Sequence, residues 1–331
     1  MQLRPRNLGE LLDTAFGIYR SQFFTLVGIA AVLLVPLAII QAVVSFYFGS
    51  ILAGLSRISN QATPAPGQNP FDVLPFGELL IAYGLLILVA IVQGVVVNNL
   101  VAGALIRAVS QAYFGQPVDV LGAYRMSIAR FPALALATIA LGLALTIASV
   151  LLLGGCGFLL IVLQGGNFNT FDERSFGLAA LMVLALAGIA FLVIVPLSLF
   201  VATRFLVAPQ AIVLEEQGPL AGLGRSWRLV GRSFWRTLLV VVVLGLLLYM
   251  VASLPSGIVS FAVTLASRGD PAGMAASNGI ATLVSSLGLI LMYPLQYAVQ
   301  TVHYYDLRTR SEGLDIELRT AALDASHGGL E

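Results

Sequence analysis

Charged residues are absent from six long stretches of this chain. Each stretch is predominantly apolar, and each is longer than the ~20 residues that an α-helix needs to cross the hydrocarbon core of a bilayer. The stretches lie between residues 20 and 57, 78 and 107, 130 and 172, 174 and 204, 236 and 268, and 270 and 306. The pattern predicts an all-α integral membrane protein with six transmembrane helices.

The composition agrees with this prediction. The chain is 59% hydrophobic and 10% charged, whereas a soluble domain carries about 25% charged residues. All 17 basic residues are arginine. They are scattered between the predicted spans rather than gathered into one basic surface, so we expect no binding to nucleic acid.

The arginines are divided unevenly between the loops. Segments 1–22, 107–130, 204–236 and 306–331 hold all but three of them, and the exceptions are Arg57, Arg174 and Arg268. Because Arg-rich loops remain on the cytoplasmic side, we expect both termini in the cytoplasm and the 60–70 loop outside. No secretory signal peptide is evident. The expected location is therefore the bacterial inner (plasma) membrane.

A recurring pair of aromatic residues indicates three copies of one unit. Each odd-numbered span follows a short segment with two aromatics seven residues apart: Phe16 and Phe23, Tyr124 and Phe131, and Trp227 and Phe234. We interpret these six as interfacial anchors. They predict three parallel helical-hairpin repeats, each preceded by a cytoplasmic amphipathic interfacial helix. The repeats cover about 7–108, 117–208 and 219–306 of a single membrane domain (1–318), and the tail, 319–331, is predicted to be flexible.

The first and third amphipathic segments carry the clearest local signals. Asn7 followed by Glu10 forms a capping box, which predicts a helix start. In the third segment one helical face is apolar, and the opposite face carries Arg225, Arg228, Arg232 and Arg236. Basic residues on an interfacial helix attract anionic lipids, so these four are candidate contacts to lipid headgroups. Placement by the positive-inside rule alone would instead make them topology anchors without a selective ligand.

The predicted spans contain polar residues but no charge near their centres, which argues against an ion pathway. Asn98, Asn99, Gln296 and Gln300 form a candidate intramembrane polar site that would line a cavity. The alternative is that they form hydrogen bonds between packed spans. Three prolines inside spans would kink them and open a crevice: Pro36, Pro196 and Pro294.

The chain contains no recognisable catalytic, metal-binding or nucleotide-binding motif, so we expect no enzyme activity, no cofactor and no metal. His303 and Asp306, at the inner end of the last span, are the nearest approach to an acid–base pair. A histidine within an interfacial aromatic belt is the simpler interpretation. The charge pairs Asp306/Arg310 and Arg308/Glu312, four residues apart, predict that the last helix continues beyond the membrane.

Two end motifs resemble a known family. They are Arg4-Pro5-x-x-Leu8-Gly9-Glu10-x-Leu12-Asp13-x-Ala15-Phe16-x-x-Tyr19-Arg20 and Tyr304-Tyr305-Asp306-Leu307-Arg308-x-Arg310-x-Glu312-Gly313-x-Asp315-x-Glu317. They are similar to the bacterial membrane domain found ahead of glycerophosphodiester phosphodiesterase domains, here as a stand-alone member. The resemblance implies a multi-span helical membrane module. In that family the activity belongs to a separate α/β barrel with two histidines, a carboxylate and a metal, and this sequence lacks those motifs.

These observations lead to two main hypotheses. In the first, this is a non-enzymatic bacterial inner-membrane protein that associates with membrane phospholipid, or with a membrane or envelope protein, and places or regulates an envelope activity. The alternative is a transporter or lipid-moving protein for neutral or amphiphilic cargo. A polar-lined cavity among the spans would favour the alternative, and a packed apolar interior would favour the first. A headgroup enzyme using His303 and Asp306 is a third and weaker hypothesis.

Overall fold

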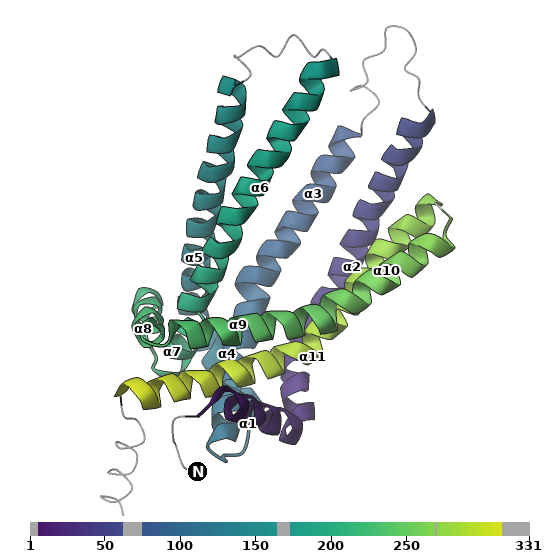
Figure 1. Cartoon of the computed structure of the whole chain (residues 1–331). Helices are drawn as coiled ribbons and strands as arrows, with labels where there is room; N and C mark the ends of the chain where they lie inside the picture. The colour runs from purple at the N-terminus through teal and green to yellow at the C-terminus, as the bar shows by residue number, and fades with distance from the viewer. Residues whose placement is uncertain (1–5, 62–74, 164–172, 269, 313–331) are drawn as a thin grey trace, which may run out of the picture.

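A computed structural model of the chain describes residues 6–61, 75–163, 173–268 and 270–312. Every regular element within these ranges is a helix (Figure 1). In chain order they are α1 (Leu8–Ser21), α2 (Phe23–Gln61), α3 (Phe76–Ile91), η2 (Val92–Val97), α4 (Asn98–Tyr113), α5 (Val120–Leu163), α6 (Glu173–Arg204), α7 (Ala208–Leu214), α8 (Pro219–Gly231), α9 (Phe234–Leu248), η3 (Tyr249–Ser253), α10 (Leu254–Ala266) and α11 (Pro271–Glu312). The predicted tail, 319–331, and most of the predicted 60–70 loop lie outside the described residues.

Six helical segments among the described residues are long and apolar enough to cross a membrane. They are Phe23–Leu55, Phe76–Tyr113, Val120–Phe158, Val183–Leu214, Phe234–Ala266 and Ala272–Glu312. The predicted number and order of apolar spans are therefore confirmed, as is the all-helical class. The chain has the architecture of a multi-pass membrane protein.

The start of α1 follows the predicted capping box. The Asn7 side chain accepts a hydrogen bond from the Glu10 backbone N–H at 2.8 Å, and the Asn7 N–H donates to the Glu10 carboxylate at 3.1 Å. These two bonds satisfy backbone donors that the first turn leaves without helical partners. The chain leaves helical geometry at Gln22, so α1 is separate from the long helix that follows.

The second amphipathic segment is not a separate helix. α1 and α8 are distinct short helices ahead of α2 and α9, but residues 121–131 form the first turns of the unbroken α5. The physical reason is a contact with another helix. Ser127, the one residue there with a good capping side chain, instead donates to the Leu100 carbonyl of α4 at 2.6 Å. Nothing therefore interrupts the helix before Pro132, which lies inside α5.

Two spans contain a π-helical segment. η2 joins α3 to α4 in the second span, and η3 joins α9 to α10 in the fifth. A π-helical segment shifts the backbone hydrogen-bond register and leaves carbonyls to be satisfied by other groups. In η2, the Asn99 side chain supplies that partner by donating to the Val95 carbonyl at 2.9 Å.

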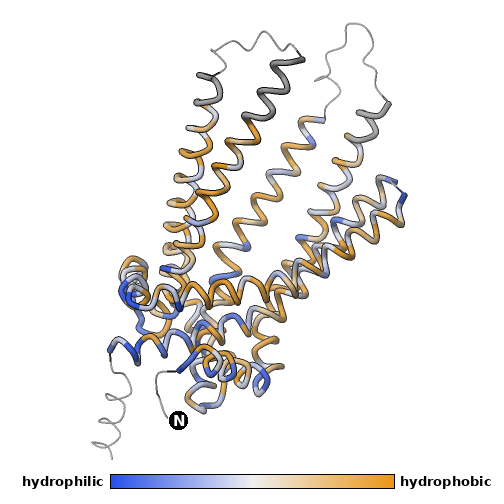
Figure 2. The backbone as a smooth tube through the Cα atoms, in the orientation of Figure 1, coloured by the Kyte–Doolittle hydropathy of each residue, from blue (hydrophilic) through white to orange (hydrophobic). Residues whose placement is uncertain are grey.

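The helices gather at one end of the molecule, which we call the base. In Figure 1, α1, α4, α7, α8 and the last turns of α11 lie together there, while α2, α3, α5 and α6 extend away from it. Figure 2 shows that hydrophilic residues are concentrated at this end and that the extended helices are largely hydrophobic. The first described residue also contacts α11 at the base, because the Arg6 backbone N–H donates to Asp306 at 2.8 Å.

Helix α4 forms the centre of the packed core. Its residues Val101, Leu105, Ala108 and Val109 are fully buried and belong to one apolar cluster that also includes parts of α1, α2, α9 and α11. Burial of large aliphatic side chains in the same cluster stabilises the base. By contrast, α5 and α6 bury few residues along their apolar windows, so most of their apolar surface is not covered by the rest of the described chain.

Small residues allow α11 to approach its neighbours closely. A Cβ added at Gly288 would lie 2.6 Å from the Val251 carbonyl oxygen and 2.7 Å from Ala252 Cα in η3. A Cβ added at Gly279 would lie 3.3 Å from the Ala42 carbonyl oxygen of α2. Close backbone approach at small residues is a common way for helices to associate in membranes.

Candidate functional site

We call the four arginines of the third amphipathic segment the arginine stripe: Arg225, Arg228, Arg232 and Arg236. In the structure, two of them form ion pairs within the protein and two are exposed beside a pocket. Arg225 is bound on both sides: its guanidinium donates to Glu215 at 2.9 and 3.0 Å and to Glu312 at 2.8 Å. Its side chain is only 16% exposed. The hydrogen bonds to Glu312 and Glu215 raise the pKa of Arg225 above its ordinary value. Arg225 is therefore a structural link between α8 and the end of α11.

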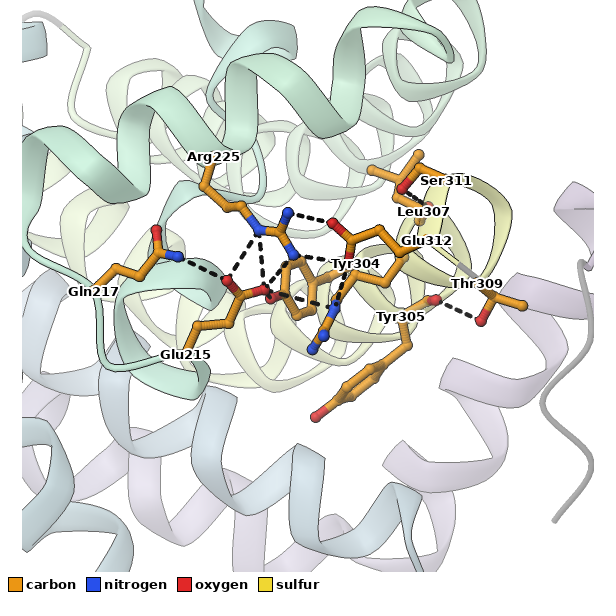
Figure 3. A network of polar contacts seen from close by, with 10 residues as sticks. Glu215, Gln217, Arg225, Tyr304, Tyr305, Leu307, Thr309, Ser311 and Glu312 are labelled. Carbon is orange, nitrogen blue, oxygen red and sulfur yellow. Dashed lines mark hydrogen bonds and ion pairs between the residues drawn. The ribbon is translucent and has the colours of Figure 1, made fainter. Parts of the chain in front are cut away.

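Glu215, which follows α7, is the hub of this network (Figure 3). Besides Arg225, its carboxylate accepts hydrogen bonds from the Tyr304 hydroxyl and from Gln217 at 2.9 Å. Arg308 lies 3.6 Å away. Charge-assisted hydrogen bonds of this kind are stronger than neutral ones, so the network fixes α7, α8 and α11 relative to one another.

Arg236 is also used inside the protein. It forms an ion pair with Asp306 at 2.9 Å and donates to the Arg6 carbonyl at 2.5 Å. The Asp306 side chain is 1% exposed and is also paired with Arg310 at 3.0 Å. A buried carboxylate needs such compensation. Asp306 therefore joins the start of the described chain, α9 and α11, and Arg236 is not positioned as a headgroup contact.

Arg228 and Arg232 remain available. Their side chains are exposed, and neither has an ion-pair or hydrogen-bond partner among the described residues. They line a pocket of about 410 Å³ together with Arg225, Leu229, Ser311 and Glu312. The one acid in this lining, Glu312, is already paired with Arg225 and Arg308. The pocket therefore carries an excess of positive charge.

Two of the predicted interfacial anchors enclose an arginine. The Arg204 guanidinium, at the end of α6, lies 4.4 Å from the ring centre of Trp227, 5.3 Å from Phe234 and 5.5 Å from Phe200. Trp227 stays 44% exposed. Cation–π contacts of this kind stabilise a partly desolvated arginine. No sequence pattern could show this enclosure, because α6, α8 and α9 each supply one ring.

The other anchors occupy different surroundings. Phe16 is partly exposed, Phe23 contacts Tyr19 edge to face, and Phe131 is half-buried. The Tyr124 hydroxyl donates to the Ile29 carbonyl of α2 at 2.5 Å. The six aromatics lie near the base, but at least three of them, Tyr124, Trp227 and Phe234, make specific contacts within the protein.

Two of the four predicted intramembrane polar residues form hydrogen bonds to side chains of other helices. Thr138 donates to the Asn99 side-chain oxygen at 2.9 Å, and Gln210 donates to Gln300 at 3.3 Å. The Gln296 and Asn98 side-chain oxygens are buried without a partner among the described residues. For Asn99 and Gln300, the structure thus shows hydrogen bonding between packed helices, which was the alternative interpretation.

A polar crevice lies elsewhere among the spans. It has a volume of about 480 Å³ and is formed by α2, α3, η2, α10 and α11. Apolar residues supply the rest of the lining, which contains no charged residue. Its uncharged polar residues are Gln41, Ser45, Gln93, Ser256, Asn278, Thr282, Ser285 and Ser286. The hydrophobic periodicity of the spans did not predict this crevice. Serine and threonine are common in transmembrane helices, where their hydroxyls often donate to a carbonyl of the same helix, so their presence alone does not indicate a cavity.

His303 and Asp306 do not form an acid–base pair. The buried His303 ring bonds through Nε2 to the Thr237 hydroxyl at 3.0 Å, and Asp306 is held by arginines as described above. No cluster of three potential metal ligands occurs among the described residues.

The comparisons with known proteins identify one family. No curated protein and no solved structure matched the chain. The family model described as "Domain of unknown function (DUF7847)" matches residues 76–307. The match spans the apolar helices from α3 through most of α11, including Arg228, Arg232 and the crevice residues of those helices. The chain therefore belongs to the DUF7847 family.

Proposed function

We propose that the chain is a non-enzymatic membrane protein that associates with anionic phospholipid through Arg228 and Arg232. This association would place or regulate an envelope activity. The observation that carries the proposal is the pocket at the base, where these two arginines are exposed and have no protein partner in the part of the chain that the structure describes.

The chemistry of the pocket fits a phosphate group. An arginine guanidinium presents parallel N–H donors that match two phosphate oxygens. Ser311, also in the lining, has a hydroxyl that donates to the Leu307 carbonyl but can still accept a hydrogen bond. The internal pairing of Arg225 and Arg236 sharpens the sequence hypothesis, because it reduces four candidate contacts to two.

The location of the base is part of the proposal. Arg-rich segments meet there, so the positive-inside rule places the base in the cytoplasm of a bacterial inner membrane. Anionic lipids give the cytoplasmic leaflet a negative surface potential. The resemblance to the membrane domain ahead of glycerophosphodiester phosphodiesterases supports a role in placing an activity rather than performing one.

The test is removal of charge from the pocket. We expect Arg228→Gln with Arg232→Gln to weaken the binding of fluorescent phosphatidylglycerol at least tenfold, since each direct hydrogen bond from an arginine to a phosphate contributes about 1.5–3 kcal/mol. Binding is measured by fluorescence anisotropy on the full chain in neutral detergent, at two or more salt concentrations.

The matched control removes two other exposed base arginines, as Arg20→Gln with Arg125→Gln. It should change affinity less than twofold and leave the salt dependence intact. Equal losses in both double variants, or binding that does not depend on salt, would show that Arg228 and Arg232 are only topology anchors.

A second candidate function is favoured by the crevice. A polar-lined volume among membrane helices is the feature that the transport hypothesis requires, and the uncharged lining suits neutral or amphiphilic cargo. Movement of a fluorescent lipid between the leaflets of proteoliposomes would separate a lipid-moving protein from one that only binds lipid.

A further inference from the structure

The crevice between α2, α3, η2, α10 and α11 has the properties of a binding site for one class of molecule. Its volume of about 480 Å³ lies within the roughly 300–1,000 Å³ of small-molecule sites. We propose that it binds a neutral amphiphile: a lipid-like molecule whose head group carries hydroxyl or ester groups and no charge. This inference is independent of the arginine pocket at the base.

Hydrogen-bonding capacity in the crevice argues for a polar head group. Gln41 donates to the Gln93 side-chain oxygen at 2.6 Å, which links α2 to η2. This bond leaves the Gln41 oxygen and the Gln93 amide N–H groups for other partners. The hydroxyls of Ser45 and Ser285 form no hydrogen bond to the described residues. An apolar chain would leave all of these groups unsatisfied at membrane depth, which is costly.

The absence of charge in the lining argues against an ionic head group. A phosphate, carboxylate or ammonium group would lose its hydration on entry and would find no opposite charge among the lining residues. The loss of hydration by an unpaired ion exceeds what uncharged hydrogen bonds return. Hydroxyl and ester oxygens avoid this penalty, and they complement both the amide donors and the serine hydroxyls.

The backbone is irregular on two sides of the crevice. Gln93 lies within the π-helical segment η2, and Ser256 follows the second such segment, η3, by one turn. The backbone of η3 packs directly on Gly288 of α11. π-Helical segments are frequent at functional sites because they redirect side chains and interrupt the regular helix surface. Here they bring amide and hydroxyl groups of different spans around one volume.

The test uses a photoreactive diacylglycerol on the full chain in phosphatidylcholine nanodiscs, with labelled peptides mapped by mass spectrometry. We expect labelling near residues 41–45 and 278–289. Excess diacylglycerol should reduce it at least fivefold, and excess phosphatidylglycerol should reduce it less than twofold. Ser285→Trp, which fills the crevice, should abolish the competed labelling.

Leu287→Trp is the matched control, because Leu287 lies on the same helix with a side chain that is 60% exposed outside the crevice. It should label like the unmodified chain. Should Ser285→Trp fail to fold, the pair Gln41→Met and Gln93→Met removes the amides at similar volume and should also lower the competed labelling at least fivefold.

Equal labelling of Ser285→Trp and Leu287→Trp would overturn the proposal, and so would equal competition by phosphatidylglycerol. The variant carrying both Arg228→Gln and Arg232→Gln should retain diacylglycerol labelling. The two proposals therefore fail separately.

Discussion

At the residue scale, side chains that look equivalent in the sequence have different roles. The four arginines of the stripe follow one helical pattern in the sequence, but the structure ends α8 at Gly231 and places Arg236 on α9. Carboxylates from distant parts of the chain bind two of the four. Glu215 and Glu312 bind Arg225, and Asp306 binds Arg236. The helical pattern predicted one continuous face, whereas the structure divides the stripe between α8 and α9. The pattern could not predict which arginines are paired, because the acids come from other elements.

The first prediction concerns the hub carboxylate. Glu215→Gln should lower the free energy of unfolding by about 1.5–3 kcal/mol, the usual contribution of hydrogen bonds to charged groups. The reason is that Arg225 would keep one carboxylate, Glu312, and the neutral amide would bind Arg225 and Tyr304 less strongly. Thermal unfolding of the detergent-solubilised protein should show a lower midpoint.

The neighbouring residue supplies the control. Glu216 also binds an arginine, Arg130, but its side chain is 60% exposed, and exposed ion pairs contribute little. Glu216→Gln should therefore leave the midpoint almost unchanged. Equal midpoints for the two variants would mean that the network shown in Figure 3 does not stabilise the base.

At the element scale, the length and hydropathy of segments predict the helices that could span a membrane. Features that depend on tertiary contacts were not predicted. The six apolar spans and the start of α1 follow from local signals. The π-helical segments do not, because they are involved in tertiary contacts such as Gln93 with Gln41 and η3 with Gly288. The merger of residues 121–131 into α5 was missed for a similar reason, since Ser127 is used by α4.

A glycine substitution tests the packing of α11 on η3. Gly288→Ala should destabilise the protein by about 1–3 kcal/mol, the usual cost of overpacking. The added methyl group would meet backbone atoms of Val251 and Ala252, which cannot move aside as a flexible side chain can. The change is measured as a lower unfolding midpoint in detergent.

Gly245 of α9 provides the comparison, because a Cβ there would meet nothing within 4 Å. Gly245→Ala should be neutral or slightly stabilising, since alanine favours helix more than glycine does. A midpoint for Gly288→Ala that equals or exceeds that of Gly245→Ala would show that the close approach of α11 to η3 is not retained in the folded protein.

At the scale of the whole molecule, the two ends differ in both packing and polarity. The base holds the ion-pair networks and the buried α4, whereas α5 and α6 extend from it with few buried residues. This asymmetry fits a membrane setting, because lipid can cover apolar helices that bury little surface within the chain. Arginine is unevenly distributed between the loops of the sequence. In the structure, the described parts of the Arg-rich segments lie together at the base.

The last prediction concerns the side of the membrane that the base faces. The positive-inside rule places it in the cytoplasm. In a Cys156→Ala background, Gln116→Cys introduces a thiol in the turn between α4 and α5, on the side of the base. Ala272→Cys introduces one in the first turn of α11, at the other end of the fifth and sixth spans; both positions are exposed. A membrane-impermeant maleimide applied to intact bacterial spheroplasts should label Ala272→Cys, and it should label Gln116→Cys only after permeabilisation. The reverse pattern would put the base outside. It would remove Arg228 and Arg232 from the anionic cytoplasmic leaflet on which the proposed lipid association depends.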